Sequence, residues 1–434
     1  MRETGTVLQA RLRDLLDEPI DWRYKALPPV PDNVTLGTLG QQGWNVLDGD
    51  LLFPVMVLKT EAMEHNLEVI ARFCSGHGIS LAPHGKTTMA PQIFNRQLEL
   101  GAWAMTAATI SQARIYRAFG IERILLANEL VDPAGLRWVV EELAADPSFS
   151  LFCLVDSEDG VRIMDQVLDE ARPKRRIEVL VELGAPGMRA GSRSGDEAMA
   201  VAAAVSRSPY LDLAGVEGYE GVIGEDRSED VVGAVDHFLE RLWRLTSALD
   251  RQGAFEGRDE IVVSAGGSAW FDLATAHLLS SPTLSKPLRF VLRAGCYVTH
   301  DDGLYERVSP LRSGGGAEVT LRPALELFGE VLSRPEPELA IVGFGKRDAP
   351  HDLDLPIPRI LARRSGEQVS LDGELKVFKM MDQHAYVRVQ GVEVDVGDVL
   401  RCGISHPCTA FNKWRLIPLV NDEYRVVGGV RTFF

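Results

Sequence analysis

The sequence predicts an α/β fold: a (β/α)8 TIM-like barrel followed by a second, smaller and mainly antiparallel β-domain. Two observations lead to this prediction. Between residues 79 and 294, short apolar runs alternate with helix-like stretches, which is typical of a parallel sheet buried on both faces. After about residue 310, apolar and polar residues alternate at a period of two, which indicates antiparallel strands.

Eight apolar runs supply the expected barrel strands. They lie at residues 79–82, 103–107, 123–127, 151–156, 177–183, 213–219, 261–265 and 289–294. Helices at residues 111–120, 132–146 and 228–252 fall between them, each with a Ser or Asp near its expected start, and a helix at 61–78 precedes the first strand. Eight such units fit a closed barrel, and an open doubly wound sheet is the alternative.

The domain boundaries follow from the change in pattern. We expect the barrel to occupy residues 50–310 and the β-domain residues 311–434. The Pro- and Gly-rich stretch at 27–43 has no helical or strand-like period, so we expect residues 1–49 to form an arm joined to the β-domain. The strand-like segments of that domain lie at residues 313–335, 339–345, 373–380, 384–404 and 423–434.

Charge and composition exclude several classes of partner. The 434 residues include 62 acidic and 46 basic side chains, and the resulting net charge of −16 disfavours nucleic acid or an anionic membrane as a partner. The charged N-terminus lacks the apolar centre of a signal peptide, and no apolar run approaches the ~20 residues of a membrane span. The five cysteines are odd in number and scattered, so we expect a reduced, cytoplasmic protein.

Polar residues gather where the expected strands end, and in a parallel barrel these ends share the face that carries catalysis. Lys86 follows the first strand by four residues, in "APHGKT". The ends of later strands carry Glu182, Gly187, Arg189, Tyr219, Glu220, Ser264, Gly266, Gly267, Ser268, Arg293, Gly295 and Tyr297. A lone lysine at a strand end is more commonly a solvated surface charge, so the convergence of these residues is the stronger signal.

The stretch "SAGGS" at residues 264–268 could bind an anion. Glycines allow backbone N–H groups to approach a phosphate, and a following helix adds a favourable dipole. Barrel phosphate sites are typically built from the last two strand loops, where "SAGGS" and "RAGCY" both fall. A lysine opposite such a site indicates pyridoxal phosphate held as a Schiff base. A tight turn before a helix explains "SAGGS" equally well.

A second constellation is the segment "CGISHPCTAFNKW". His406 and Cys408 lie two residues apart, so an extended backbone places both side chains on one face. Imidazole and thiolate together suit zinc, and two protein ligands leave the open positions that a catalytic ion needs. A structural cysteine beside an exposed histidine is the commoner reading of such a pair. Cys402 is interpreted as a core residue, and His84 and His384, taken alone, as structural.

The assembled motifs resemble those of the D-serine dehydratase and D-threonine aldolase family, which has the alanine-racemase-like fold. "APHGKT" is similar to its "PH-x-KT" signature, "DQHA" at residues 382–385 to its "EHG" element, and "HPC" to its metal-binding "H-x-C" or "H-x-D". "GKRD" at residues 345–348 extends the resemblance. The chain departs from the pattern at Ala82 and at Thr88-Met89, where the family has Arg and "HK". The "amino acid deaminase" members are therefore its nearest expected relatives.

The resemblance implies roles for the candidate residues. Lys86 would carry pyridoxal 5′-phosphate as a Schiff base, with His84 beside it, and His384 would take part in catalysis. Arg293 would face the pyridine nitrogen, with Arg189 or Tyr219 as alternatives. The cofactor phosphate would be bound by Gly266, Gly267, Ser268, Gly295 and Tyr297. His406 and Cys408 would bind zinc or another divalent metal.

The resemblance also implies an activity. The expected reaction is a metal-assisted β-elimination that converts a D-3-hydroxy amino acid such as D-serine to a 2-oxo acid and ammonia. Cys rather than Asp in the "H-x-C" element favours the dehydratase branch. The alternatives are aldolase cleavage of the Cα–Cβ bond, a racemase, which would need no metal, and a non-catalytic protein that binds the same cofactor. A homodimer is expected from the fold family.

Overall fold

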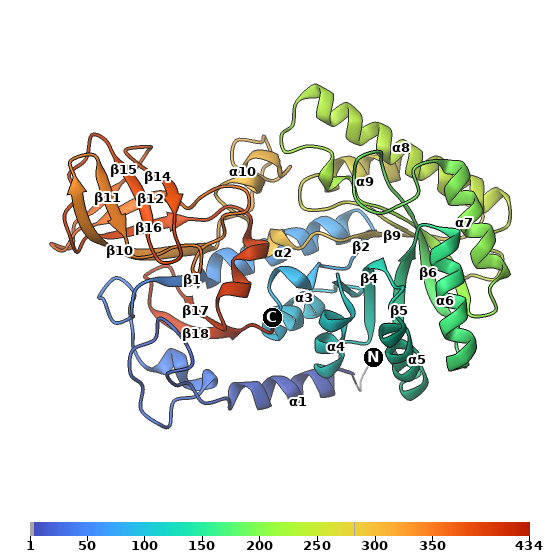
Figure 1. Cartoon of the computed structure of the whole chain (residues 1–434), viewed down its shortest axis with the longest axis horizontal. Coiled ribbons are helices and arrows are strands. Elements are labelled where there is room, and N and C mark those ends of the chain that lie inside the picture. Colours follow the sequence, from blue (N-terminus) through green and yellow to red (C-terminus); the bar gives the residue numbers. More distant parts are fainter. Residues whose placement is uncertain (1–3, 282) are drawn as a thin grey trace. The chain divides into compact units, whose positions relative to one another are not determined.

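The structure is a computed structural model that describes residues 4–281 and 283–434. The chain divides into two compact units, which are described separately (Figure 1). Unit 1 comprises the N-terminal residues to Leu8, Ala71–Lys86 and Gln97–Gly295, and unit 2 comprises Gln9–Ile70, Thr87–Arg96 and Cys296–Phe434. This division differs from the predicted boundaries at residues 50 and 310. The strand at residues 55–59 pairs within unit 2, and the last segment of unit 2 begins at Cys296.

Unit 1 is built on an eight-stranded parallel sheet in the order β2-β9-β8-β7-β6-β5-β4-β3. Its strands are β2 (Ser80–Leu81), β3 (Met105–Ala107), β4 (Arg123–Glu129), β5 (Ser150–Val155), β6 (Ile177–Leu183), β7 (Leu211–Gly218), β8 (Ile261–Ser264) and β9 (Leu288–Leu292). The two end strands meet, because Trp103 N donates to Leu81 O at 2.7 Å and Thr106 N to Pro83 O at 2.9 Å. The predicted (β/α)8 barrel is confirmed, and each predicted strand overlaps an observed one.

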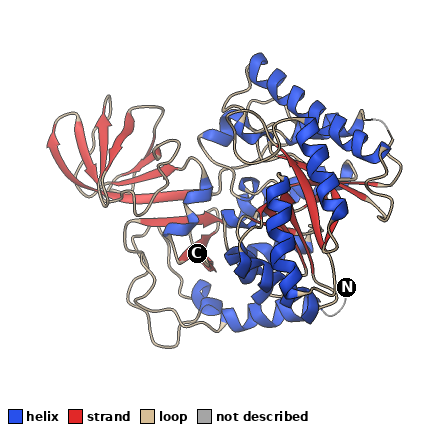
Figure 2. Cartoon of the chain, turned by 45° about the vertical axis from the view of Figure 1, so that its right-hand side comes forward, coloured by secondary structure: helices blue, strands red, loops and turns tan. Residues whose placement is uncertain are grey.

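Helices follow the barrel strands and lie around them (Figure 2). They are α4 (Ile110–Ala118), α5 (Pro133–Ala145), α6 (Glu158–Ala171), α7 (Gly195–Arg207), α8 (Glu229–Arg251) and α9 (Phe271–Leu279). Asp132 caps α5 as predicted, through bonds from the backbone of Ala134 and Gly135. The prediction of a serine cap for α4 is wrong, because Thr109 accepts the capping bond from Gln112 N.

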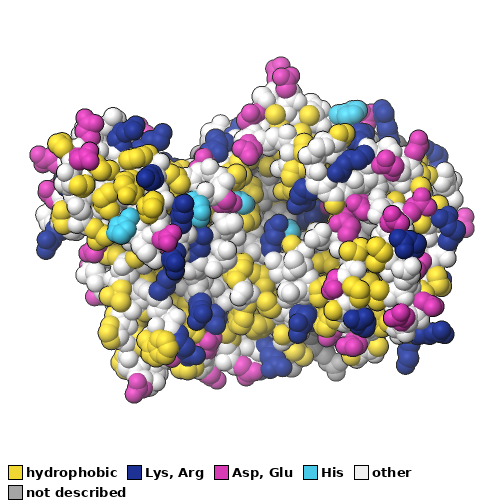
Figure 3. Space-filling view, viewed as in Figure 1, with side chains coloured by type: hydrophobic (Ala, Val, Ile, Leu, Met, Phe, Trp, Pro, Cys, Tyr) yellow, Lys and Arg dark blue, Asp and Glu magenta, His cyan; other side chains and the backbone are white. Residues whose placement is uncertain are grey.

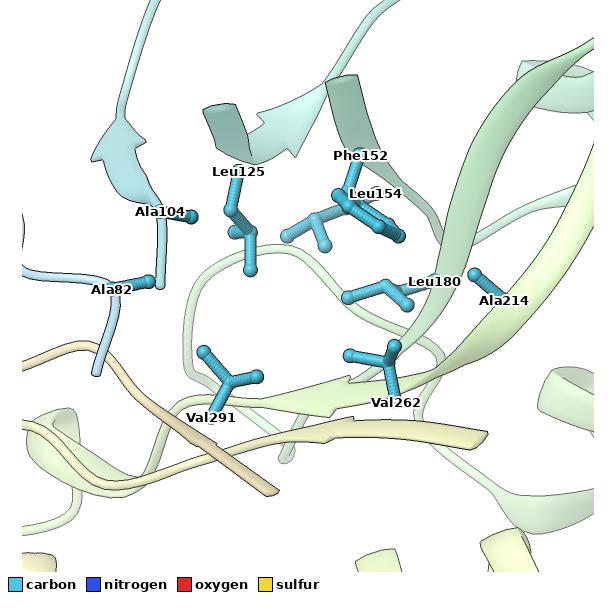
Figure 4. Close-up of a cluster of buried hydrophobic side chains, with 9 residues drawn as sticks. All are labelled: Ala82, Ala104, Leu125, Phe152, Leu154, Leu180, Ala214, Val262 and Val291. Atoms are coloured by element: carbon cyan, nitrogen blue, oxygen red, sulfur yellow. The ribbon is translucent and has the colours of Figure 1, made fainter. Parts of the chain in front are cut away.

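The barrel interior is filled by aliphatic and aromatic side chains that point toward one another (Figure 4). They are Ala82, Ala104, Leu125, Phe152, Leu154, Leu180, Ala214, Val262 and Val291. Successive strand residues alternate between faces, so Glu182 and Ser264 lie on the same face as Leu180 and Val262, one step nearer the carboxyl ends. The interior therefore changes from apolar to polar at the end of the barrel where the candidate residues lie.

Unit 2 contains a ten-stranded sheet with the main order β13-β12-β16-β10-β1-β17-β18, and β11, β14 and β15 extend it from β10. Its strands are β1 (Val55–Lys59), β10 (Leu325–Glu336), β11 (Leu339–Val342), β12 (Ile357–Ala362), β13 (Gln368–Ser370), β14 (Leu375–Met380), β15 (Ala385–Val389), β16 (Val399–Gly403), β17 (Leu416–Val420) and β18 (Val426–Arg431). Among the pairings of the described strands of this sheet, only the β1–β17 pair is parallel. The predicted, mainly antiparallel domain is confirmed.

The remaining helices are α1 (Thr4–Leu16), α2 (Thr60–Gly76), α3 (Pro91–Glu99) and α10 (Leu304–Val308). Within the described residues, no helix has the length and apolar character needed to cross a membrane. Acidic and basic side chains are interspersed over the face drawn in Figure 3.

Candidate active site

Lys86 lies in a single 3-10 turn, Gly85–Thr87, just beyond the carboxyl end of β2. The preceding backbone is held to the end of β9, because Ala82 N donates to Leu292 O and His84 N to Ala294 O. The Lys86 side chain is half-buried, and no described residue forms a hydrogen bond or ion pair with its amine. The turn thus presents an uncommitted amine at the polar end of the barrel.

His84 is two residues from Lys86, and its Nδ1 atom is buried without a hydrogen-bond partner among the described residues. Burial lowers the pKa of His84 well below its usual value, and the positive charges of Lys86 and Arg293 lower it further. His84 is therefore neutral at physiological pH. An unpaired nitrogen in such a place is costly and is suited to a polar group that arrives from outside.

Arg293 and Glu217 form an ion pair with side chains that are only 5% and 1% exposed. The Arg293 Nε atom also donates to Ser264 Oγ at 2.9 Å. Glu217 stands beside Ser264 in the β7–β8 register and beside Glu182 in the β6–β7 register, so these groups form one layer. The layer fixes the guanidinium in one orientation, because Arg293 is bound on two sides.

Glu182 carries a proton at neutral pH. Burial raises its pKa to about 10, and the charge of Glu217 and a hydrogen bond to Glu129 contribute to the rise. The Oε2 atoms of Glu182 and Glu217 are both buried without a partner among the described groups. Neighbouring carboxyl groups cannot all ionise in a buried place, so this end of the barrel contains both a carboxylic acid and a carboxylate.

The glycine loop, residues 264–269, lies beside Tyr219. A Cβ atom on Gly267 would lie 2.9 Å from the Tyr219 ring, so only glycine fits there. The N–H groups of Gly266 and Gly267 donate to the buried carboxylate of Glu220, at 3.1 and 2.8 Å. Arg189 is exposed and lies over the Tyr219 ring, with its guanidinium carbon 4.6 Å from the ring centroid. The loop is thus held by Tyr219 and Glu220, which directly follow β7.

In unit 2, Cys408 belongs to a cluster of polar and sulfur-containing side chains. Its Sγ atom lies 3.1 Å from Cys296 Sγ and 3.5 Å from Thr87 Oγ1. His406 adopts a left-handed backbone conformation, with φ of 59°, and Asp352 Oδ2 lies 2.5 Å from its Nδ1 atom. All five cysteines of the chain are free thiols.

The charged side chains of this cluster shift one another's pKa values. The hydrogen bond from Cys296 holds the pKa of Cys408 well below that of an ordinary thiol, and His406 contributes in the same direction. Burial opposes the positive charge on His406, yet the Cys408 thiolate and the Asp352 carboxylate together raise the His406 pKa to about 9. Cys408 is therefore a thiolate, which is the form that binds metals.

The donor set of this cluster fits a divalent metal. Asp352 bonds to Nδ1 of His406, which leaves Nε2 for an ion, and a carboxylate at the other nitrogen is the usual companion of a metal-binding histidine. Thr409 Oγ1 donates to the second Asp352 oxygen at 2.7 Å and fixes the carboxylate. Within the described chain, no group of three or more His, Cys, Asp or Glu side chains is placed to hold a metal ion. An ion held by His406 and Cys408 alone would keep open positions, because these are only two ligands.

The remaining predicted site residues are His384, Tyr297 and Gly295. His384 is in the exposed turn between β14 and β15, and no contact within the described residues joins its side chain to His406 or Cys408. Tyr297 is fully buried in the turn Cys296–Val298, and Gly295, also buried, directly precedes that turn. Their proposed roles stay predictions.

Pyridoxal 5′-phosphate, the cofactor expected of the family that the motifs resemble, fits the residues at the barrel end. Lys86 offers a free amine for the aldehyde, and the orphaned Nδ1 of His84 offers a polar partner. The N–H groups of Ser268 and Ala269 donate to no described residue and are available to a phosphate.

Several residues of these clusters could not be predicted from the sequence. Glu217 was hidden inside an apolar strand, although its position one step from the strand end is the signal that also marked Glu182. The approach of Asp352 to His406 and of Cys296 to Cys408 depends on tertiary folding and has no local signal in the sequence.

Comparisons with known proteins agree with this architecture. The family model "Alanine racemase, N-terminal domain" matches residues 58–280, and "Putative serine dehydratase domain" matches residues 324–420, which include His406 and Cys408. D-threonine aldolase from Arthrobacter sp. is 27% identical over 375 residues, which cover 85% of this chain and 89% of that protein.

Solved structures show the same fold. The crystal structure of D-threonine aldolase from Filomicrobium marinum matches with a TM-score of 0.73 and 23% identity, over 90% of this chain and 97% of that one. D-threo-3-hydroxyaspartate dehydratase from Delftia sp. HT23 matches with a TM-score of 0.70 and 20% identity, over 90% and 99%. The chain therefore belongs to the D-serine dehydratase and D-threonine aldolase family, with the alanine-racemase-like fold.

Proposed function

We propose that this protein is a lyase dependent on pyridoxal phosphate and a divalent metal, zinc being the ion that the donor set suits best. It converts a D-3-hydroxy amino acid, such as D-serine, to a 2-oxo acid and ammonia. One observation carries the proposal: Lys86 has an uncommitted amine, and the next residue, Thr87, contacts Cys408 at 3.5 Å. The residue that directly follows the proposed cofactor lysine thus belongs to the cluster that would hold the metal.

Lys86 has two tasks in this proposal. Its amine would hold the cofactor through the aldehyde, and as a free base it would accept the proton from the substrate Cα. The bound cofactor supplies an electron sink for the pair left by that proton. His84 stays neutral, so it can hydrogen-bond nearby without adding a second positive charge.

His406 and Cys408 would hold the metal ion. Hydroxide is a poor leaving group, and the metal would supply a Lewis acid that stabilises it. The eliminated water is regained when the product hydrolyses, so the net change is release of ammonia and a 2-oxo acid. Asp352 holds Nδ1 of the His406 ring, so Nε2 would be the nitrogen available to an ion.

The buried layer of unit 1 would orient the cofactor ring. Glu217 and Ser264 hold the Arg293 guanidinium, which would face the ring nitrogen. A guanidinium held on two sides loses little entropy on binding, so the layer can define the ring position. Glu182 stays protonated and limits the negative charge of the layer.

A retro-aldol cleavage is the second candidate, because the 27% identical relative is a D-threonine aldolase. The same metal would then act on the 3-hydroxyl while the Cα–Cβ bond breaks. D-threonine separates the two reactions. Elimination yields 2-oxobutyrate and ammonia, whereas aldol cleavage yields glycine and acetaldehyde.

The proposal is tested with a panel of D-serine, D-threonine and D-threo-3-hydroxyaspartate, each assayed for ammonia and 2-oxo acid and for glycine and aldehyde, with zinc and with a chelator. We expect zinc-dependent release of ammonia and 2-oxo acid from at least one substrate, and its loss in Lys86→Ala. Lys346→Ala, a change at an exposed lysine, is the matched control. Aldehyde release would support the aldolase, and inactivity over a wide D-amino-acid panel would support a non-catalytic cofactor-binding protein.

A further inference from the structure

Glu220 is completely buried at the end of β7, yet its side chain faces the backbone of a different strand loop. Its two carboxylate oxygens each accept one N–H group, from Gly266 at 3.1 Å and from Gly267 at 2.8 Å. Two consecutive N–H groups that converge on an anion form an anion-binding concavity. In this structure a side chain of the protein itself occupies that concavity.

The glycine loop is fixed from its opposite side as well. Gly266 O accepts a hydrogen bond from Arg293 N at 3.0 Å, which ties the loop to the end of β9. Gly266 has φ of +86°, and a Cβ atom there would lie 2.4 Å from Leu292 Cδ2. The loop is thus held between β9 and the Tyr219–Glu220 turn, with little room to shift.

The next two residues of the loop, Ser268 and Ala269, differ from Gly266 and Gly267 in their hydrogen bonding. Neither the Ser268 nor the Ala269 N–H group donates to any described residue, although both residues are 8% exposed. Buried N–H groups are rarely left unpaired, because each costs a lost hydrogen bond. They lie just before Trp270, the N-cap residue of α9, so the helix dipole adds to their attraction for an anion.

We propose that Glu220 is a positioning residue for the cofactor phosphate: it binds Gly266 and Gly267 and so directs the N–H groups of Ser268 and Ala269 to the phosphate. The inference rests on the proposed function, because it requires a phosphate-bearing cofactor. It differs from the expectation that Gly266 and Gly267 bind the phosphate through their own N–H groups. Displacing Glu220 would leave a buried carboxylate without partners, which is why it clamps the loop rather than competing with the phosphate.

The test compares Glu220→Gln with the wild type in the cofactor-free protein, titrated with pyridoxal 5′-phosphate and, separately, with pyridoxal. An amide keeps the size of the carboxylate but turns an N–H group toward one of the two loop donors. We expect the Kd for pyridoxal 5′-phosphate to rise about tenfold, as for loss of one charge-assisted bond, and the Kd for pyridoxal to change less than twofold. Glu225→Gln, an exposed change in the same turn region, should alter neither constant.

An equal weakening of both ligands would show a general structural role and overturn the inference, as would tighter phosphate binding in Glu220→Gln. If the variant does not fold, hydrogen exchange of the wild-type protein tests the inference independently. The clamp predicts slow exchange at Gly266 and Gly267 before any cofactor is added, and rapid exchange there would overturn it. Failure of the wild type to bind either ligand would instead refute the proposed function, and the inference with it.

Discussion

The sulfur atoms of Cys296 and Cys408 lie 3.1 Å apart, although 112 residues separate them in the chain. Cys408 is also a proposed metal ligand, so its thiolate has two possible fates. A bound metal would engage it, and an oxidant could join it to Cys296. The two fates exclude each other, which makes the metal state measurable by thiol chemistry.

We expect diamide, which accepts two electrons and two protons, to form a Cys296–Cys408 disulfide in the metal-free protein. A bound zinc ion should slow this reaction, because a coordinated thiolate is a poorer nucleophile toward the oxidant. Mass spectrometry of unreduced peptides measures the cross-link. Cys296→Ser should abolish it, and Cys402→Ser, at another buried thiol, should leave it intact. Equal rates with and without zinc would contradict the metal assignment.

Metal binding should depend on Asp352 as well as on the two ligands. His406→Ala or Cys408→Ser is expected to remove the bound ion, and Asp352→Asn to weaken its affinity by about 10- to 100-fold, as for other partners of metal-binding histidines. Metal content and chelator competition measure both effects. His351→Ala, next to Asp352 and exposed, is the control. Full zinc affinity in Asp352→Asn would show that the carboxylate does not orient the ligand.

The ion pair of Arg293 and Glu217 should be critical for stability. Glu217→Gln leaves the guanidinium buried without an opposite charge, which typically costs about 3–5 kcal/mol. Denaturant unfolding followed by fluorescence measures the loss. Asp159→Asn breaks an exposed pair with Arg162, with side chains 84% and 57% exposed, and should cost no more than about 1 kcal/mol. Similar losses in both variants would contradict the buried layer.

Glu182 should make stability depend on pH. Its pKa is about 10 in the folded chain and 4.5 as a free group, so unfolding releases a proton between these values. Wild-type stability therefore falls as pH rises through that window, by up to about 1.4 kcal/mol per pH unit from this group. Glu182→Gln cannot titrate, so its melting temperature relative to the wild type should increase from pH 5 to pH 9. The exposed control Glu170→Gln should differ from the wild type in melting temperature by the same amount at every pH. The same constant difference for Glu182→Gln would show that Glu182 is ionised in the folded protein.

The barrel could be predicted because its strands are buried on both faces and appear as continuous apolar runs. The same rule gave no way to identify β1, whose sequence "VMVLK" has the texture of a barrel strand. Its place was decided by pairing with residues far along the chain, such as Val55 with Phe328. The local sequence indicates whether a strand is buried, but not which other strand it pairs with.

The candidate site residues could likewise be predicted only in part. The rule that polar groups at strand ends share one face selected Lys86, Glu182 and Arg293 in advance. The sequence also indicated that the glycine loop could bind an anion, but not that Glu220 already takes two of its N–H groups. The companions of His406 and Cys408 come from segments 54 and 112 residues away, and only the tertiary fold brings them together.

The role of Lys86 as cofactor anchor is tested most directly by loading the protein with pyridoxal 5′-phosphate, reducing it with borohydride and mapping the labelled lysine by peptide mass spectrometry. We expect one pyridoxyl group, on the peptide that contains Lys86, and no label at that site in Lys86→Ala. A label on another lysine, or none on a protein that remains folded, would contradict the central claim that Lys86 anchors the cofactor.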